Sequence, residues 1–156
     1  MRIGHGIDVH RVSDDPSREL WLGLVHVPGP GLVGHSDADV VTHALCDALL
    51  GAANLGDLGR HFPDTDVEFA GASSRRLLVE TVQLVSEEGW RVMSADITIM
   101  AEQPKLAPFM PSMSTELSSV VGSLVTVKAT TTEGLGALGR VEGIAATAVA
   151  LLEQVR

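Results

Sequence analysis

The sequence is poor in aromatic residues, cysteine and positive charge. Phe and Trp supply 3% of its 156 residues and Tyr is missing, so a buried core must be aliphatic. The single Cys46 excludes an internal disulfide framework and suits a reducing cytoplasm. Lys and Arg number 11 against 20 Asp and Glu. The resulting charge of −9 argues against a nucleic acid or an anionic membrane as the main partner, because both reward a basic surface.

Long apolar runs and targeting segments are also missing. The longest stretch without a charged residue, 20–36, is broken by the Pro and Gly residues at 28–31. A membrane-spanning helix needs about 20 mainly apolar residues, so we expect a soluble, cytoplasmic protein. The mean hydropathy of +0.23 indicates that part of the apolar surface faces another subunit.

Hydrophobic periodicity predicts strands and helices in one domain that spans residues 1–156. A period of two over 3–10 is typical of a half-buried strand, and it puts Asp8 and His10 on the face opposite Ile7 and Val9. Residues 56–66 show neither period and predict an irregular loop. Further strands are expected at 20–27, 90–101 and 124–131, and helices from about 40 after a cap at Ser36 or Asp37, at 73–88 and at 105–121. The pattern is that of an α/β or α+β fold.

The C-terminal residues 143–152 allow two interpretations. Ile144, Ala148 and Leu151 follow helical spacing, which favours a helix. The same apolar run also fits a strand that is buried on both faces. Periodicity alone prefers the helix.

Asp8, His10 and His43 form the sharpest candidate site. Residues at i and i+2 of a strand share a face, and a histidine from the following helix can complete a three-ligand set. Two imidazoles and one carboxylate with an open fourth position are the donors that catalytic zinc uses. The alternative is that Asp8 and His10 are surface polar residues and that His43 is a hydrogen-bonded helical histidine.

The segment KATTTE at 128–133 is a second candidate. Hydroxyls and free backbone amides at a strand end can hold phosphate oxygens, and Glu133 can hold a hard cation such as Mg²⁺. The alternative, compatible with the first, is a capping box of Thr130 and Glu133. Two G-x-G-x-x-G patterns, at 29–34 and 134–139, lack the βαβ context of a dinucleotide site and are predicted as turns.

Six segments, in this order, resemble the 2-C-methyl-D-erythritol 2,4-cyclodiphosphate synthase family. They are MRIGHGIDVH at 1–10, HSDAD at 35–39, HALCDALLG at 43–51, GDLG at 56–59, FPDTD at 62–66 and KATTTE at 128–133. The resemblance runs from residue 1 to about residue 152. It implies a compact α/β (α+β) subunit with a mixed sheet covered by helices. It also implies a homotrimer with its sheets toward the three-fold axis and active sites between neighbours. By resemblance 143–152 is a strand, and we adopt this over the helical interpretation.

The resemblance also implies a reaction. The 2-phosphate of 4-diphosphocytidyl-2-C-methyl-D-erythritol 2-phosphate would attack the β-phosphorus and expel CMP, forming the cyclic diphosphate of non-mevalonate isoprenoid synthesis. Zn²⁺ would bind to Asp8, His10 and His43, and Mg²⁺ or Mn²⁺ to Glu133 and the substrate phosphates. An anion attacking an anion needs positioning and charge neutralisation more than a general base.

Further residues match family positions by resemblance. His35 and Thr131 match those that stabilise the transition state. The positions of the methylerythritol phosphate pocket are matched by Ser36, Asp57, Gly59, Phe62, Asp64 and Asp66. The cytidine site is matched by Ala101, Pro104, Lys105, Leu106 and Thr130.

Two departures lie near the expected trimer axis. There Arg140, counted among the substrate-binding positions, and Glu142 match residues beside a cavity that can hold isoprenoid diphosphates in the family. Ala137 replaces a frequent aromatic residue, and Val141 stands where Gly is usual. A lost ring and added bulk near Arg140 argue against an isoprenoid diphosphate site in this chain.

Two other functions stay open. A zinc hydrolase could use the same open site to ionise water. A trimeric sensor of isoprenoid diphosphates could use Arg140 and Glu142 without catalysis.

Overall fold

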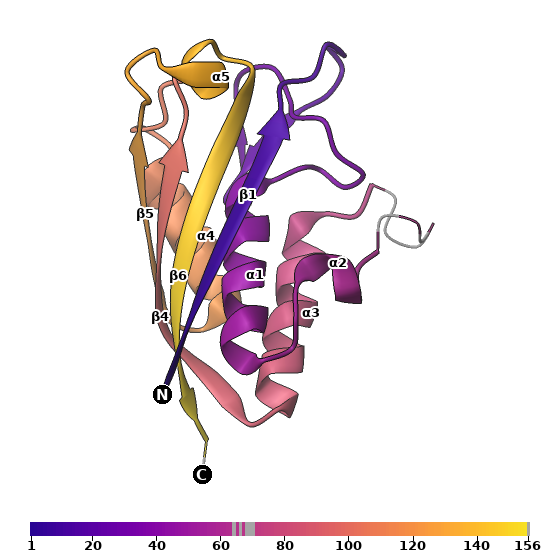
Figure 1. Ribbon diagram of the computed structural model, residues 1–156, viewed down its shortest axis with the longest axis vertical. Coiled ribbons are helices and arrows are strands. Elements are labelled where there is room, and N and C mark those ends of the chain that lie inside the picture. The colour runs from indigo at the N-terminus through magenta and orange to yellow at the C-terminus, as the bar shows by residue number, and fades with distance from the viewer. Residues whose placement is uncertain (64, 66, 68–70, 156) are drawn as a thin grey trace.

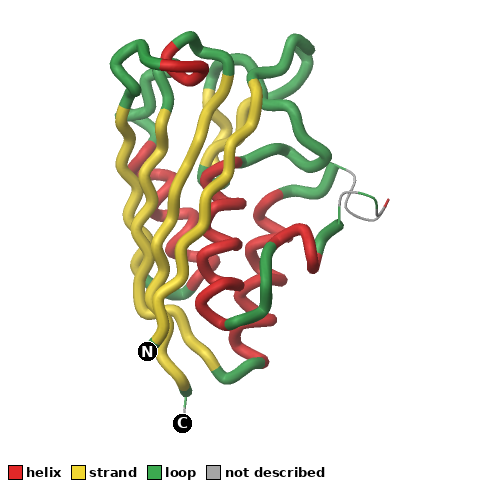
Figure 2. Tube along the Cα trace, in the orientation of Figure 1, coloured by secondary structure: helices red, strands yellow, loops and turns green. Residues whose placement is uncertain are grey.

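One face of a four-stranded sheet is covered by helices (Figures 1 and 2). The computed structural model describes residues 1–63, 65, 67 and 71–155. The strands lie in the order β1 (Arg2–Arg11), β6 (Gly143–Gln154), β4 (Trp90–Met100) and β5 (Leu124–Thr130). Because β6 is antiparallel to β1 and β4, and β4 is parallel to β5, strands β1, β4 and β5 all end at the same end of the sheet. The predicted α+β fold with a mixed sheet is confirmed.

Three long helices form the second layer. Helix α1 (Val40–Ala53) packs on β1 and β6, α4 (Met110–Val121) packs on β5, and α3 (Ser74–Glu87) packs against α1 and α4. The one-turn helices α2 (Leu58–His61) and α5 (Gly136–Gly139) lie outside this layer (Figure 1). In the described part of the chain, no helix is long and apolar enough to cross a membrane.

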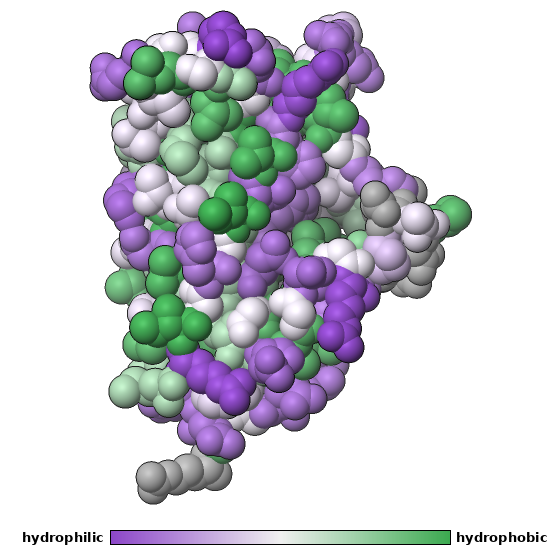
Figure 3. All heavy atoms as spheres, in the orientation of Figure 1, coloured by the Kyte–Doolittle hydropathy of each residue, from purple (hydrophilic) through white to green (hydrophobic). Residues whose placement is uncertain are grey.

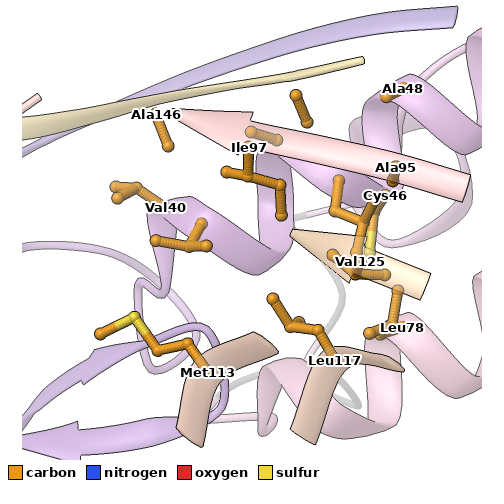
Figure 4. Packing of buried hydrophobic residues seen from close by; sticks show 14 of the residues in the cluster. Val40, Cys46, Ala48, Leu78, Ala95, Ile97, Met113, Leu117, Val125 and Ala146 are labelled. Atoms are coloured by element: carbon orange, nitrogen blue, oxygen red, sulfur yellow. The ribbon is translucent and has the colours of Figure 1, made fainter. Parts of the chain in front are cut away.

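The core between sheet and helices is aliphatic, as the composition predicts. Ile97 of β4 and Met113 and Leu117 of α4 are fully buried in one hydrophobic cluster (Figure 4). Cys46 of α1 lies in the same cluster, and burial raises the pKa of its thiol to about 12. A thiol in this state behaves as a small apolar side chain and not as a nucleophile.

Glycines of β1 let α1 approach the strand closely. A Cβ atom at Gly4 would lie 1.8 Å from the carbonyl oxygen of Ala48, and one at Gly6 would lie 2.0 Å from that of Ala44. Any side chain at these two positions would therefore push the helix away. Because β1 carries Asp8 and α1 carries His43, this contact brings the two candidate ligands together.

An alternating strand usually buries its apolar side chains, but β1 buries the opposite face. Gly4 and Gly6 are buried against α1, whereas the apolar Ile3, Ile7 and Val9 are 73%, 55% and 58% exposed. The strand is half-buried as predicted, but its apolar side chains point away from the core. Figure 3 shows hydrophobic side chains spread over the face of the molecule where β1 and β6 lie. Among the described residues, no segment covers that face in Figures 1 and 2.

Three predicted elements needed correction in their local form. Residues 20–27 form a hairpin of β2 (Leu20–Leu22) and β3 (Val25–Val27), because Gly23 and Leu24 adopt positive φ angles and reverse the chain. The helix expected over 105–121 begins only at Met110. The loop expected over 56–66 contains α2.

The cap of α1 is Asp39 and neither Ser36 nor Asp37. Its buried carboxylate accepts hydrogen bonds from the amides of Val41 and Thr42, and also from those of Gly23 and Leu24 in the β2–β3 turn. Sequence spacing could not reveal the second pair of donors, which is a tertiary contact. The predicted helix at 73–88 and the strands at 90–101 and 124–131 are confirmed. Residues 143–152 are a strand, so the helical interpretation was wrong.

Candidate metal centre and substrate cavity

Asp8, His10 and His43 converge on one point between β1 and α1. Oδ2 of Asp8 lies 3.0 Å from Nε2 of His10 and 3.1 Å from Nδ1 of His43. One donor atom from each residue lies within 4.8 Å of the other two. The three side chains therefore lie together, as predicted, and form a cluster that could hold a metal ion.

The second nitrogen of each imidazole is engaged elsewhere, which leaves the converging nitrogens free to bind a cation. Nδ1 of His10 lies 2.6 Å from the carbonyl oxygen of Val33. Nε2 of His43 lies 3.0 Å from Oγ of Ser74 and 3.3 Å from Oγ of Ser36. Partners of this kind fix the tautomer and orientation of histidines that bind metals.

The charges of the three side chains depend on one another. Burial raises the pKa of Asp8, but hydrogen bonds from His10 and His43 lower this pKa by a larger amount. The pKa of Asp8 therefore lies well below its ordinary range. The hydrogen bond to Asp8 raises the pKa of His10 above its ordinary value of 6.5, although burial opposes this. Asp8 is therefore ionised at neutral pH, as a metal-binding carboxylate must be.

A cavity of about 570 Å³ opens directly onto this cluster. It is lined by Asp8, His10, Gly34, His35, Ser36, His43, Asp47, Leu58, Gly59, Phe62, Pro63 and Leu77. Its volume lies in the range of sites that hold small organic ligands. The cavity thus brings together the predicted metal ligands, His35, which was predicted to stabilise the transition state, and the predicted pocket residues Ser36, Gly59 and Phe62. Asp57 lies outside the lining and caps α2, accepting from the amide of Arg60. Asp64 and Asp66 lie outside the described residues.

Asp47 and Arg18 contribute to the cavity although sequence reasoning did not assign them to it. Asp47 lies one turn after His43 on α1 and accepts a hydrogen bond from the amide of Leu58, 2.7 Å away. Burial raises the pKa of Asp47. The i, i+4 spacing of His43 and Asp47 was the available signal for it.

Arg18 holds the loop that forms one wall of the cavity. Its guanidinium donates to the carbonyl oxygens of Leu32, Gly34 and Ser36, with the latter two 2.8 and 2.6 Å away. This loop supplies Val33, the partner of His10, and also His35. No local pattern marks Arg18, because its partners are backbone atoms 14 to 18 residues away.

The remaining predicted site residues gather at the end of β5, on the opposite edge of the sheet. Thr130 ends β5, and its carbonyl oxygen accepts from the amide of Ala101, 3.0 Å away. The hydroxyl of Thr131 lies 3.4 Å from Oε1 of Glu133. The segment with Pro104, Lys105 and Leu106 follows β4 at this same end of the sheet. Two strands, β6 and β4, separate this cluster from β1, which is about 14 Å at the usual strand spacing. One chain therefore does not bring the two predicted half-sites together.

Glu102 organises the loop that follows β5. Its Oε1 accepts from the amides of Thr132 and Gly134, at 2.8 and 3.2 Å, and from the hydroxyl of Thr132. These hydrogen bonds, that of Gly134 first, lower the pKa of Glu102. The predicted capping box does not form, because Glu133 adopts a φ of +54° and the next helix is capped at Leu135. The amides of Thr132 and Gly134, expected to be free, are held by Glu102.

Arg140 and Glu142 form an ion pair after α5. Nε of Arg140 lies 2.6 Å from Oε1 of Glu142, and both are exposed in this chain. Val141 between them has a φ of +62°, in the left-handed region that favours glycine. This backbone conformation is the physical reason why a glycine suits this position.

Comparisons with known proteins agree with this geometry. Residues 1–153 match the model of the YgbB family. A 2-C-methyl-D-erythritol 2,4-cyclodiphosphate synthase of Azotobacter vinelandii is 56% identical, with 97% of this chain and 98% of the relative covered. A solved structure of such a synthase in its CDP-bound form is 37% identical, covers 97% of this chain and 100% of that chain, and has a TM-score of 0.88. The bifunctional IspDF of Campylobacter jejuni is 41% identical over 98% of this chain with a TM-score of 0.93, and this chain spans 42% of it. The chain therefore belongs to the YgbB family, whose relatives named above are 2-C-methyl-D-erythritol 2,4-cyclodiphosphate synthases.

Proposed function

We propose that this protein is a metal-dependent 2-C-methyl-D-erythritol 2,4-cyclodiphosphate synthase. It converts 4-diphosphocytidyl-2-C-methyl-D-erythritol 2-phosphate to the cyclic diphosphate and CMP, a lyase reaction of non-mevalonate isoprenoid synthesis. The observation that carries the proposal is the Asp8, His10 and His43 cluster at the floor of a ligand-sized cavity, in a chain of this family.

The three side chains fit Zn²⁺. Their donors are one ionised carboxylate oxygen and two imidazole nitrogens, and the cavity leaves an open side for a fourth ligand. Zn²⁺ held by these three side chains would supply a Lewis acid for a phosphoryl oxygen. Closed structural sites instead use several cysteines, and the single Cys46 is buried in the core.

The chain's own residues orient the substrate in the cavity. His35 and Ser36 line the wall beside the metal ligands, and His35 stabilises the transition state through its imidazole. Gly59 and Phe62 line the part of the cavity that takes the methylerythritol phosphate, and the family resemblance assigns Asp57, Asp64 and Asp66 to the same phosphate. Because both reacting groups are phosphates, holding them at attacking distance and neutralising their charge removes most of the barrier. A water nucleophile is not needed.

The cytidine and diphosphate groups bind at the end of β5. Ala101, Pro104, Lys105, Leu106 and Thr130 hold the cytidine, Thr131 stabilises the transition state through its hydroxyl, and Glu133 holds Mg²⁺ or Mn²⁺ at the phosphates. This assignment is supported by the position of Thr131 and Glu133 directly after β5, where the Thr131 hydroxyl lies 3.4 Å from Oε1 of Glu133. The charge of −9 makes cations and amides the natural counter-charge for an anionic substrate.

The active enzyme is a homotrimer in which one chain supplies the β1 edge of a site and its neighbour supplies the β5 edge. Two observations support this: the half-sites lie on opposite edges of one sheet, and Ile3, Ile7, Val9 and Val149 leave an apolar strip on the uncovered face. That face turns toward the three-fold axis.

Arg140 and Glu142 lie near this axis. Because Ala137 lacks an aromatic ring and Val141 adds bulk beside Arg140, we propose that no isoprenoid diphosphate binds there.

The direct test is a product assay with the cytidine substrate. Wild-type protein loaded with Zn²⁺ and Mg²⁺ should release CMP and the cyclic diphosphate in equal amounts, and His43→Ala should lose both zinc and turnover. A linear bisphosphate as the product would instead identify a hydrolase. Binding of isoprenoid diphosphate without any turnover would identify a sensor.

Subunit mixing tests the shared site. His43→Ala and Glu133→Ala chains disrupt different half-sites, so each homotrimer should be inactive. Subunits of the two variants that are unfolded and refolded together should regain activity, because some interfaces then receive both intact edges. Absence of recovery in mixed trimers of confirmed composition would contradict a site shared between chains.

A further inference from the structure

The imidazole of His43 meets a buried hydroxyl on the side away from Asp8. Its Nε2 lies 3.0 Å from Oγ of Ser74, the first residue of α3, which is fully buried. The hydroxyl of Ser74 is in turn hydrogen-bonded to Oδ1 of Asp37, and the amide of Ser74 donates to Oδ2 of Asp37 at 2.8 Å. Three segments, around residues 37, 43 and 74, thus meet behind the metal-binding face of His43.

The contacts of His43 with Ser74 and of Ser74 with Asp37 fit a series of hydrogen bonds that runs from His43 to Asp37. Nδ1 of His43 faces Asp8 and must be unprotonated when it binds a metal, so in the metal-bound protein Nε2 would carry the ring proton. Nε2 then donates to Ser74, and the Ser74 hydroxyl donates to the carboxylate of Asp37. The carboxylate is the end of the chain, because it can only accept when ionised.

Ser36 is the competing partner of the same nitrogen. Its Oγ lies 3.3 Å from Nε2, against 3.0 Å for Ser74, and it already accepts from the amide of Ala38. Ser36 also lines the cavity, where a ligand can reach it. Ser74 combines the shorter contact with full burial and a charged acceptor for its own proton, so it is the stronger acceptor for His43.

We propose that Ser74 and Asp37 are positioning residues for the metal ligand His43. The inference rests on the proposed function, in which Asp8, His10 and His43 hold Zn²⁺. A carboxylate that accepts from a zinc-bound histidine fixes the tautomer and raises the donor strength of the ring. Here the Ser74 hydroxyl stands between the two groups and transmits the same effect. It also ties the ligand to the first turn of α3, so helix and metal site are held in one arrangement.

Zinc affinity is the primary test, because it does not require turnover. We expect Ser74→Ala to weaken zinc binding by about 10- to 100-fold, the usual effect of losing such a partner. Asp37→Asn should weaken zinc binding in the same direction, because it keeps the volume but removes the charge of the final acceptor. Ser74→Thr keeps the hydroxyl and should recover most of the affinity. The dissociation constants are measured by competition with a chelator of known affinity.

Ser73→Ala is the matched control. Ser73 is the neighbouring residue and caps α3 by accepting from the amide of Arg76, and the described hydrogen bonds of His43 go to other residues. Its loss should lower the thermal midpoint of the metal-free protein and leave the zinc dissociation constant unchanged. If Ser73→Ala weakens zinc binding as much as Ser74→Ala, the effect is one of helix stability and the proposal is wrong.

Histidine ¹⁵N NMR on the zinc-loaded protein gives a readout that helix stability alone would not change. In the wild type, the Nε2 proton of His43 should be visible and slow to exchange, and in Ser74→Ala it should exchange with water much faster. Failure of the wild type to bind zinc would overturn the proposed function. Zinc binding by the wild type with equal affinity in Ser74→Ala and Asp37→Asn would overturn only this inference.

Discussion

Oδ2 of Asp8 lies 3.1 Å from Nδ1 of His43, although 35 residues separate the two in the chain. The contact exists because α1 lies directly on β1 at Gly4 and Gly6, with backbone against backbone. The small residues Ala44 and Ala48 on α1 complete this close fit. Metal binding thus depends on two glycines that contact no metal themselves.

Gly6→Ala should therefore damage both stability and metal binding. The added Cβ would lie 2.0 Å from the carbonyl oxygen of Ala44, so α1 must shift away from β1. We expect a loss of roughly 1–3 kcal/mol in unfolding free energy, the usual range for overpacking, together with weaker zinc binding. Urea unfolding of the metal-free protein and a zinc titration measure the two effects.

Gly51→Ala is the control for this substitution. Gly51 lies in α1, and apart from its chain neighbours and the backbone of the helix itself, no described atom lies within 4 Å of the position that a Cβ would take there. Ala should therefore raise stability by about 0.5–1 kcal/mol and leave zinc binding unchanged. A Gly6→Ala protein with wild-type stability and zinc affinity would contradict the role of the close approach.

Arg18→Met should loosen the loop over 32–36 and weaken substrate binding more than zinc binding. The substitution keeps most of the aliphatic stem but removes three hydrogen bonds from a charged donor to backbone carbonyl oxygens. We expect a loss of about 2 kcal/mol or more in unfolding free energy, because each such bond contributes about 1.5–3 kcal/mol and the carbonyls partly regain water. The KM for the cytidine substrate should rise.

Arg11→Met is the matched control for Arg18. Arg11 is exposed and pairs with Asp14, a type of surface ion pair that contributes about 0–1 kcal/mol. Its unfolding midpoint and KM should stay close to those of the wild type. Equal effects of the two variants would show that Arg18 does not support the loop.

Zinc binding should weaken as the pH falls through the raised pKa of His10. In the metal-free protein, the hydrogen bond to Asp8 stabilises protonated His10, and a metal must displace that proton. As the pH is lowered, the zinc affinity should therefore begin to fall while the pH is still above 6.5. Below the raised pKa of His10, the affinity should fall at least about tenfold for each pH unit. Histidine ¹⁵N NMR of the metal-free protein gives the midpoint, and chelator competition at each pH gives the affinity.

His10 and Asp8 also contribute to the pH dependence of the stability of the metal-free protein. The pKa of His10 is raised on folding, so its contribution is complete below 6.5 and is lost as the pH rises through the raised value. The pKa of Asp8 is lowered, so its contribution is present above 3.8 and is lost as the pH falls. Zinc should stabilise the fold most at pH values at which His10 has lost its proton. A His10 midpoint at or below 6.5 would contradict this account.

Val141→Gly should stabilise the protein. A left-handed conformation costs a non-glycine residue roughly 1–2 kcal/mol, while glycine loses about 0.5–1 kcal/mol in backbone entropy on folding. The net gain should be up to about 1 kcal/mol in urea unfolding at equal chain concentration. Val79→Gly in α3 should instead lower stability, because its backbone is helical. A destabilised Val141→Gly protein would mean that packing of the Val141 side chain outweighs the backbone strain.

Local patterns were enough to predict most elements and to put Asp8 and His10 on one face, whereas spacing left the role of His43 as a third ligand open. The i, i+2 spacing of Asp8 and His10 on a strand determines that they share a face, because side chains alternate along any extended chain. Helical spacing likewise predicted the course of α1 and α3. The run over 143–154 was ambiguous, because a strand buried on both faces has no period of two to distinguish it from a buried helix.

Only the tertiary structure decided which face of β1 is buried, and which partners complete the site. The alternation over 3–10 indicated two faces, but the backbone contact at Gly4 and Gly6 turned the apolar face outward. Asp39, Arg18, Ser74 and Glu102 bind atoms 14 to 37 residues away, mostly backbone amides and carbonyls that every residue possesses. The type of a residue determines what it can bind. The packing of helices on strands determines which backbone amides and carbonyls lie within its reach.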